Sequence, residues 1–123
     1  MTTLGRSKSF NSNVMSIKVM SQEAIKANVV RKAHVLCNDR INHNPNIAIP
    51  GILESIRTQL EWLVAFFEGH NNERNKLHEL MFSHYAAREL DERDDEFINA
   101  LYKANYVASK TAAGLKIDPK ELE

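Results

Sequence analysis

Residues 50–69 read PGILESIRTQLEWLVAFFEG and form the most hydrophobic stretch of the 123-residue chain. Large apolar side chains recur there every three or four residues, the pattern of a helix that packs into a bundle. These side chains are Leu53, Ile56, Leu60, Leu63 and Phe67. We therefore expect a core helix over residues 50–69, with Pro50 in its first turn and Gly69 at its end.

Three further segments show helical patterns on either side of this core helix. The first covers about 21–42 and ends before Pro45, because the residue before a proline avoids the helical region. The other two cover about 73–90 and 94–115, and an acidic turn separates them. Four helices joined by short loops predict an all-α, mostly antiparallel four-helix bundle.

The two ends of the chain differ from this helical part. Residues 1–15 are rich in Ser, Thr and Asn, so we expect a flexible arm that is disordered or loosely docked. We expect a single helical domain over 16–117, followed by a polar tail over 118–123. The length of the chain also indicates one domain.

The formal net charge is zero, but the charges are unevenly distributed. Residues 1–40 hold seven Lys and Arg against two Asp and Glu, whereas residues 41–123 hold nine against fourteen. The larger part therefore presents an acidic surface. Such a surface disfavours nucleic acid, which binds clustered Lys and Arg, and favours a basic protein partner.

Cysteine content and hydropathy restrict where the protein works. A single cysteine, Cys37, excludes an internal disulfide and agrees with a reducing compartment. No apolar run approaches the ~18–20 residues of a membrane span, and the first residues lack the apolar region of a signal peptide. We expect a cytoplasmic protein that does not bind membranes.

The most unusual feature is the acidic turn at residues 89–96, ELDERDDE, which places six carboxylates and one arginine in eight residues. Capping the next helix needs one carboxylate, from Asp91 or Asp94, and the helix dipole favours about two more. Three interpretations stay open: capping alone, a protein-binding surface, or a metal site. Arg93 and the order of the carboxylates disagree with a calcium loop.

Motifs of catalysis are missing from the sequence. His78 and His84 are six residues apart, so they do not share a helical face, and the chain contains no HExxH motif, Gly-rich phosphate loop or nucleophile elbow. Cys37 lies on the apolar stripe of its helix and is expected to be a packed core residue. We predict that the chain is not an enzyme and has no catalytic residue, metal or cofactor.

The segment 77–116 resembles the C-terminal half of a family of type VI secretion immunity proteins. The likeness lies in LHEL, YAARELDERDDEFINALYKANYVA and GLKID. The residues that carry it are Leu77, His78, Ala87, Glu89, Asp91, Glu92, Asp94, Glu96, Ala100, Leu101, Ala104, Tyr106, Val107, Gly114, Leu115 and Lys116. Members are small helical proteins encoded beside an interbacterial toxin, and the best-known one neutralises an NAD(P)+ glycohydrolase of ADP-ribosyltransferase-like fold.

The resemblance implies an immunity protein that binds a cognate toxin domain and blocks its NAD(P)+-binding cleft. The toxin contacts that we predict are Glu89, Asp91, Glu92, Asp94, Asp95 and Tyr85. Two alternatives from other classes remain: a small helical enzyme that binds a metal or nucleotide, and a homo-oligomeric helical adaptor. In the adaptor, or in a homodimer, the wide apolar face of the 50–69 helix would form the interface.

Overall fold

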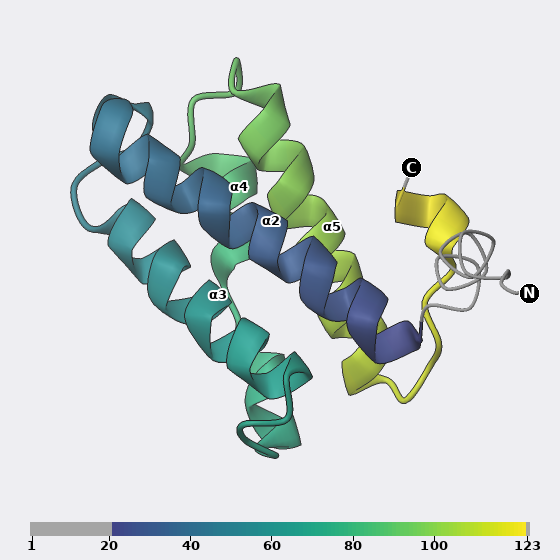
Figure 1. Cartoon of the computed structure of the whole chain (residues 1–123). Coiled ribbons are helices and arrows are strands. Elements are labelled where there is room, and N and C mark those ends of the chain that lie inside the picture. The colour runs from purple at the N-terminus through teal and green to yellow at the C-terminus, as the bar shows by residue number, and fades with distance from the viewer. Residues whose placement is uncertain (1–20, 123) are drawn as a thin grey trace, which may run out of the picture.

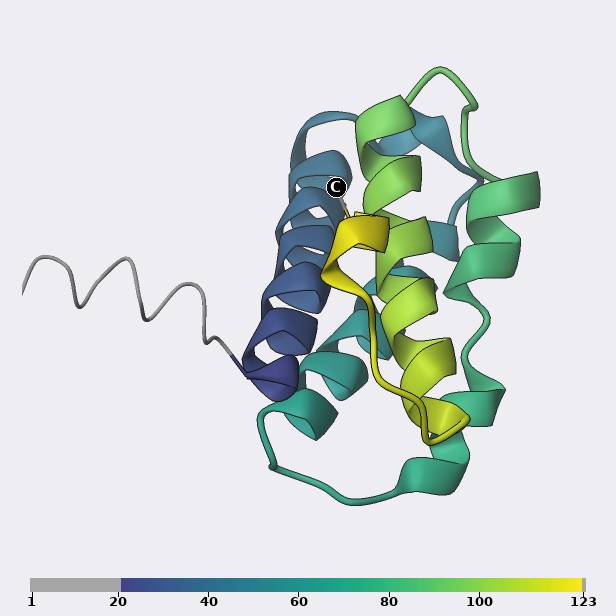
Figure 2. The same ribbon diagram turned by 90° about the vertical axis from the view of Figure 1, so that its right-hand side faces the viewer.

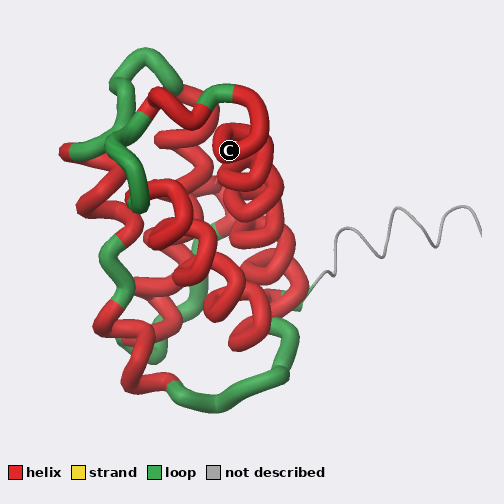
Figure 3. The backbone as a smooth tube through the Cα atoms, turned by 90° about the vertical axis from the view of Figure 1, so that its left-hand side faces the viewer, coloured by secondary structure: helices red, strands yellow, loops and turns green. Residues whose placement is uncertain are grey.

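The computed structural model describes residues 21–122, and most of them are helical (Figure 3). No strand occurs within these residues, and the all-α prediction is confirmed. The α-helices are α2 (Gln22–His43), α3 (Ile52–Phe67), α4 (Phe82–Arg88) and α5 (Asp95–Ala112). The 3-10 helices are η1 (Pro45–Ile47), η2 (Arg74–Glu79) and η3 (Pro119–Leu122).

The helices form the antiparallel bundle that the short loops predicted. Helix α2 lies between α3 and α5 and packs against both of them (Figure 1). Helices α4 and η2 cover another side of α5, and α4 also contacts α3 (Figure 2). The end of α2 and the start of α5 therefore meet at one end of the bundle, where the acidic turn lies (Figure 1).

Helix α3 supplies the core side chains that its periodicity predicted. All five of the predicted residues are buried, namely Leu53, Ile56, Leu60, Leu63 and Phe67. The helix itself is shorter than the expected 50–69, because Pro50 and Gly51 form a tight turn in which the Ile52 N–H donates to the Ile49 carbonyl. Cys37 of α2 is fully buried, as expected for a packed core residue.

The expected helix over 73–90 is wrong in one respect, because it is divided into η2 and α4. Leu80 is extended, with ψ 135°, so the helical backbone stops there. The side chain of Gln59 on α3 explains the break: its Oε1 accepts hydrogen bonds from the backbone N–H of Met81 at 2.6 Å and of Phe82 at 3.0 Å. A side chain of α3 thus accepts hydrogen bonds from the free backbone N–H groups at the start of α4.

The chain after α5 returns along the bundle and packs between α2 and α5 (Figure 2). Gln22 holds it through two hydrogen bonds: its Nε2 donates to the Ile117 carbonyl at 3.2 Å, and its Oε1 accepts from the Ile117 N–H at 2.8 Å. Ile117 is buried, and Leu122 of η3 packs on the core. The N-terminal arm at 1–15, the first residues of the 16–117 domain and Glu123 of the tail lie outside the described residues, so the domain bounds stay predictions.

Candidate functional site

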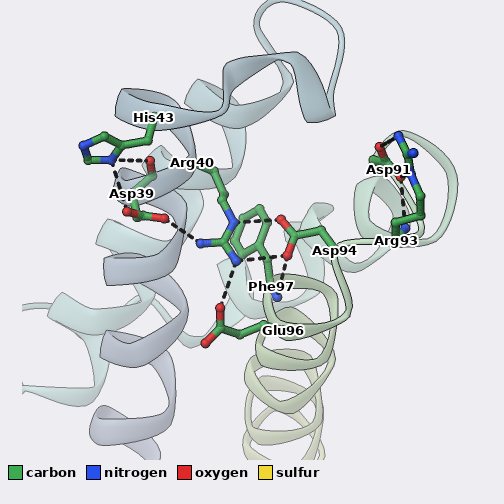
Figure 4. A network of polar contacts seen from close by, with 8 residues as sticks. All are labelled: Asp39, Arg40, His43, Asp91, Arg93, Asp94, Glu96 and Phe97. Atoms are coloured by element: carbon green, nitrogen blue, oxygen red, sulfur yellow. Dashed lines mark hydrogen bonds and ion pairs between the residues drawn. The ribbon is translucent and has the colours of Figure 1, made fainter.

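An ion pair between Arg40 and Asp94 holds the acidic turn against the end of α2 (Figure 4). Arg40 Nε donates to Asp94 Oδ2 at 2.7 Å, and Arg40 Nη2 donates to Asp94 Oδ1 at 2.9 Å. Both side chains are only 13% exposed. Asp94 also caps α5, because its Oδ1 accepts from the Phe97 N–H at 3.4 Å. One carboxylate therefore starts α5 and joins it to α2.

Arg40 also forms ion pairs with two further carboxylates at the surface. Its Nη1 donates to Asp39 at 2.6 Å, and its Nη2 donates to Glu96 at 3.0 Å. The hydrogen bonds with Asp94 raise the pKa of Arg40, and in return the pKa of Asp94 lies below its ordinary value. The guanidinium lies 5.9 Å from the centre of the Phe97 ring. This single cation offsets repulsion among three of the neighbouring carboxylates.

A second ion pair shapes the turn itself. Asp91 accepts from the Arg93 backbone N–H at 3.0 Å and from the Arg93 guanidinium at 2.7 and 3.0 Å. These hydrogen bonds lower the pKa of Asp91 to about 2. The Asp91 backbone N–H donates to the Ile47 carbonyl at 2.8 Å, which ties the turn to η1. The turn is therefore fixed at two positions, Asp91 and Asp94.

The five carboxylates among the predicted contact residues fall into two groups in the structure. Asp91 and Asp94 are engaged in the intramolecular pairs. The side chains of Glu89, Glu92 and Asp95 are exposed and form no ion pair or hydrogen bond among residues 21–122. Tyr85 is half-buried and packs against the core. The second group of carboxylates has no partner within residues 21–122, and the role of all six residues stays a prediction.

Arg40 is the site residue that the sequence did not reveal. It lies in the last turn of α2, 54 residues before Asp94, so no local motif joins the two. The one signal was the excess of six carboxylates over the single Arg93 in the turn, which called for a cation from elsewhere. A shallow groove lies between the end of α2 and the acidic turn. It is lined by Asp39, Arg40, Asn44, Ile47, Asp91, Arg93 and Asp94.

The charged side chains that line this groove are paired with one another. Its arginines face carboxylates, so their charges are already paired. Within residues 21–122 no group of three or more His, Cys, Asp and Glu side chains is arranged to hold a metal ion. No helix in the same range is long and apolar enough to cross a membrane.

Known proteins of similar sequence identify the family of this chain. A family model described as Tsi6 matches residues 26–110, which span α2 to α5 and include the whole acidic turn. The chain belongs to the Tsi6 family. The immune protein Tsi6 of Pseudomonas aeruginosa is 33% identical over 89 residues, which cover 72% of this chain and 92% of that protein. The resemblance to type VI secretion immunity proteins is thereby confirmed.

A solved structure agrees with this membership. One chain of the structure of Tse6 in complex with Tsi6 matches this protein with a TM-score of 0.65 and 32% identity. The match covers 76% of this chain and 96% of that one. The Tsi6 fold is therefore the helical bundle described above, and the relative from Pseudomonas aeruginosa is named an immune protein.

Proposed function

We propose that this protein is an immunity protein that binds a cognate interbacterial toxin domain of a type VI secretion system. It blocks the NAD(P)+-binding cleft of that domain and protects the producing cell from within its cytoplasm. The observation that carries this proposal is the match to a chain solved in complex with a second protein, Tse6. The protein acts by binding and carries out no reaction.

The charge of the acidic turn suits such a target. A cleft that receives a dinucleotide pyrophosphate is expected to be basic, and carboxylates compete for the same positive field. Complementary charge also speeds association, which matters when a toxin must be captured before it acts. Glu89, Glu92 and Asp95 supply exposed negative charge, while Arg40 and Arg93 hold the backbone that presents them.

A charge reversal at the free carboxylates tests this proposal. The variant Glu89→Lys with Glu92→Lys changes the surface charge without touching the Arg40 and Arg93 pairs. We expect it to weaken binding of the purified toxin domain by about 100-fold or more, because like charges then face each other. The affinity is measured by titration calorimetry at two salt concentrations, and toxin NAD+ cleavage is followed in parallel.

The matched control reverses the same number of charges elsewhere. Glu79 and Glu121 are exposed and lie outside the acidic turn, so Glu79→Lys with Glu121→Lys makes an equal change in net charge. If both double variants weaken binding equally, net charge and not the acidic turn governs recognition. If the wild-type protein binds no toxin domain encoded beside it, the proposed function is wrong.

A further inference from the structure

One exposed aliphatic side chain lies beside the acidic turn. Ile49 is 60% exposed, although isoleucine is among the residues most often buried. It lies two residues after Ile47, whose carbonyl accepts the Asp91 N–H at 2.8 Å. Two residues span at most about 7 Å, so Ile49 lies close to the end of the bundle that carries the free carboxylates.

The backbone around Ile49 is held on both sides. On one side, Ile47 is buried in the core and bonded to the turn. On the other side, the Ile49 carbonyl accepts the Ile52 N–H at 3.3 Å across Pro50 and Gly51. Gly51 has φ 91° and ψ −21°, the left-handed conformation that the third position of a type II turn requires.

This geometry suits a contact residue. The pyrrolidine ring of Pro50 fixes one dihedral angle of the turn, and the left-handed Gly51 is a conformation that other residues adopt only with strain. An apolar side chain on such a backbone loses little conformational entropy when it is buried by a partner. Interfaces commonly combine a buried apolar anchor with a polar rim that excludes water.

We propose that Ile49 is an apolar anchor of the toxin interface, and that the acidic turn forms the charged rim beside it. The partner surface that fits is an apolar pocket with basic side chains on the side that meets Glu89 and Glu92. This inference rests on the proposed function and adds to it a residue outside the acidic turn. The hydrogen bond between the Asp91 N–H and the Ile47 carbonyl holds the acidic turn at a fixed position beside the segment that carries Ile49.

Leu115 provides a matched control. It is an isomer of isoleucine and is 55% exposed, so its truncation removes the same atoms from a similar environment. It follows α5, whose start carries the acidic turn, and the 18 residues of α5 span about 27 Å. The two side chains therefore lie toward opposite ends of the bundle.

The experiment measures the dissociation constant of the full chain for the toxin domain, inactivated by mutation and encoded beside it. We expect Ile49→Ala to weaken binding by about tenfold or more and Leu115→Ala to change it by less than about twofold. Melting curves of both variants, recorded by circular dichroism, check that the fold is intact. Because both side chains are exposed, we expect melting temperatures close to that of the wild-type protein.

The outcomes separate the two proposals. If the wild-type chain binds and Ile49→Ala binds equally well, the anchor assignment is overturned while the immunity function stands. Equal losses in Ile49→Ala and Leu115→Ala also overturn the anchor, because the effect is then not specific to this end of the bundle. If the wild-type chain does not bind, the immunity function is overturned and the anchor with it.

Discussion

Replacing Asp94 separates the two tasks that its carboxylate performs. Asp94→Asn keeps an oxygen that can cap α5, because asparagine is as good an N-cap as aspartate, but it removes the charge that pairs with Arg40. Asp94→Ala removes both the cap and the charge. The difference between the two variants therefore reports the cap, and the effect of Asp94→Asn reports the ion pair.

The structure indicates the size of each effect. Loss of an N-cap costs about 1 kcal/mol. The two hydrogen bonds from Arg40 are charge-assisted and both side chains are 13% exposed, so the pair is partly shielded from water and contributes about 2 kcal/mol. Asp39 and Glu96 also pair with Arg40, so the guanidinium keeps two carboxylate partners when Asp94 is replaced. These partners limit the free-energy cost of removing the Asp94 charge. We expect losses of about 2 kcal/mol for Asp94→Asn and about 3 kcal/mol for Asp94→Ala.

Unfolding in guanidinium or urea, followed by circular dichroism, gives the free energy of unfolding for each variant. A double-mutant cycle with Arg40→Met isolates the pair, since methionine keeps much of the aliphatic stem but no charge. We expect a coupling energy of about 2 kcal/mol between residues 40 and 94. Asp39→Asn in the same cycle is the control, because Asp39 is 47% exposed and its coupling should not exceed about 1 kcal/mol.

A coupling energy below about 0.5 kcal/mol between Arg40 and Asp94 would contradict a strong ion pair at this position. Such a value is typical of an exposed ion pair. It would mean that packing and not this pair holds the acidic turn to α2. Equal stability of Asp94→Asn and Asp94→Ala would contradict the separate contribution of the cap.

Three further outcomes are expected. The pKa of Asp91 is lowered to about 2, and the pKa of Asp94 is lowered as well. Both ionised carboxylates therefore stabilise the fold above about pH 4, and this stabilisation is lost as the pH falls. Acid unfolding of the variant Asp91→Asn with Asp94→Asn should depend less on pH than that of the wild type. Gln59→Ala should cost about 1–2 kcal/mol and speed hydrogen exchange at Met81 and Phe82, and unchanged exchange would contradict the capping role. Burial raises the pKa of the Cys37 thiol to about 12, so a thiol reagent near pH 8 should label the native protein only at its rate of opening; immediate labelling would contradict the burial.

The sequence predicted the helices whose pattern is local. The apolar spacing of residues 50–69 identified all five buried side chains of α3, because one face of a helix follows from a repeat of 3.6 residues. Asp94 was one of two caps that the sequence allowed, and it is the one that accepts the Phe97 N–H. These features depend on residues only a few positions apart.

The pattern was less informative where a helix contacts two neighbours. Val29 and Leu36 are large apolar residues of α2, but both are only partly buried. The fully buried residues of α2 include Val30 as well as Cys37, which was expected in the core. Because α2 packs against α3 and α5 at once, its inner surface is wider than a single apolar stripe.

The all-α class, the core helix and the concentration of carboxylates at residues 89–96 could all be predicted from the sequence. The tertiary structure decided how those carboxylates are used: Asp91 and Asp94 are bonded within the protein, while Glu89, Glu92 and Asp95 face the solvent. It also decided where the third helical segment breaks, through Gln59 of α3. The physical reason is the same in both cases, because a hydrogen bond or ion pair depends on distance in space and its partner can be 54 residues away, as Arg40 is from Asp94.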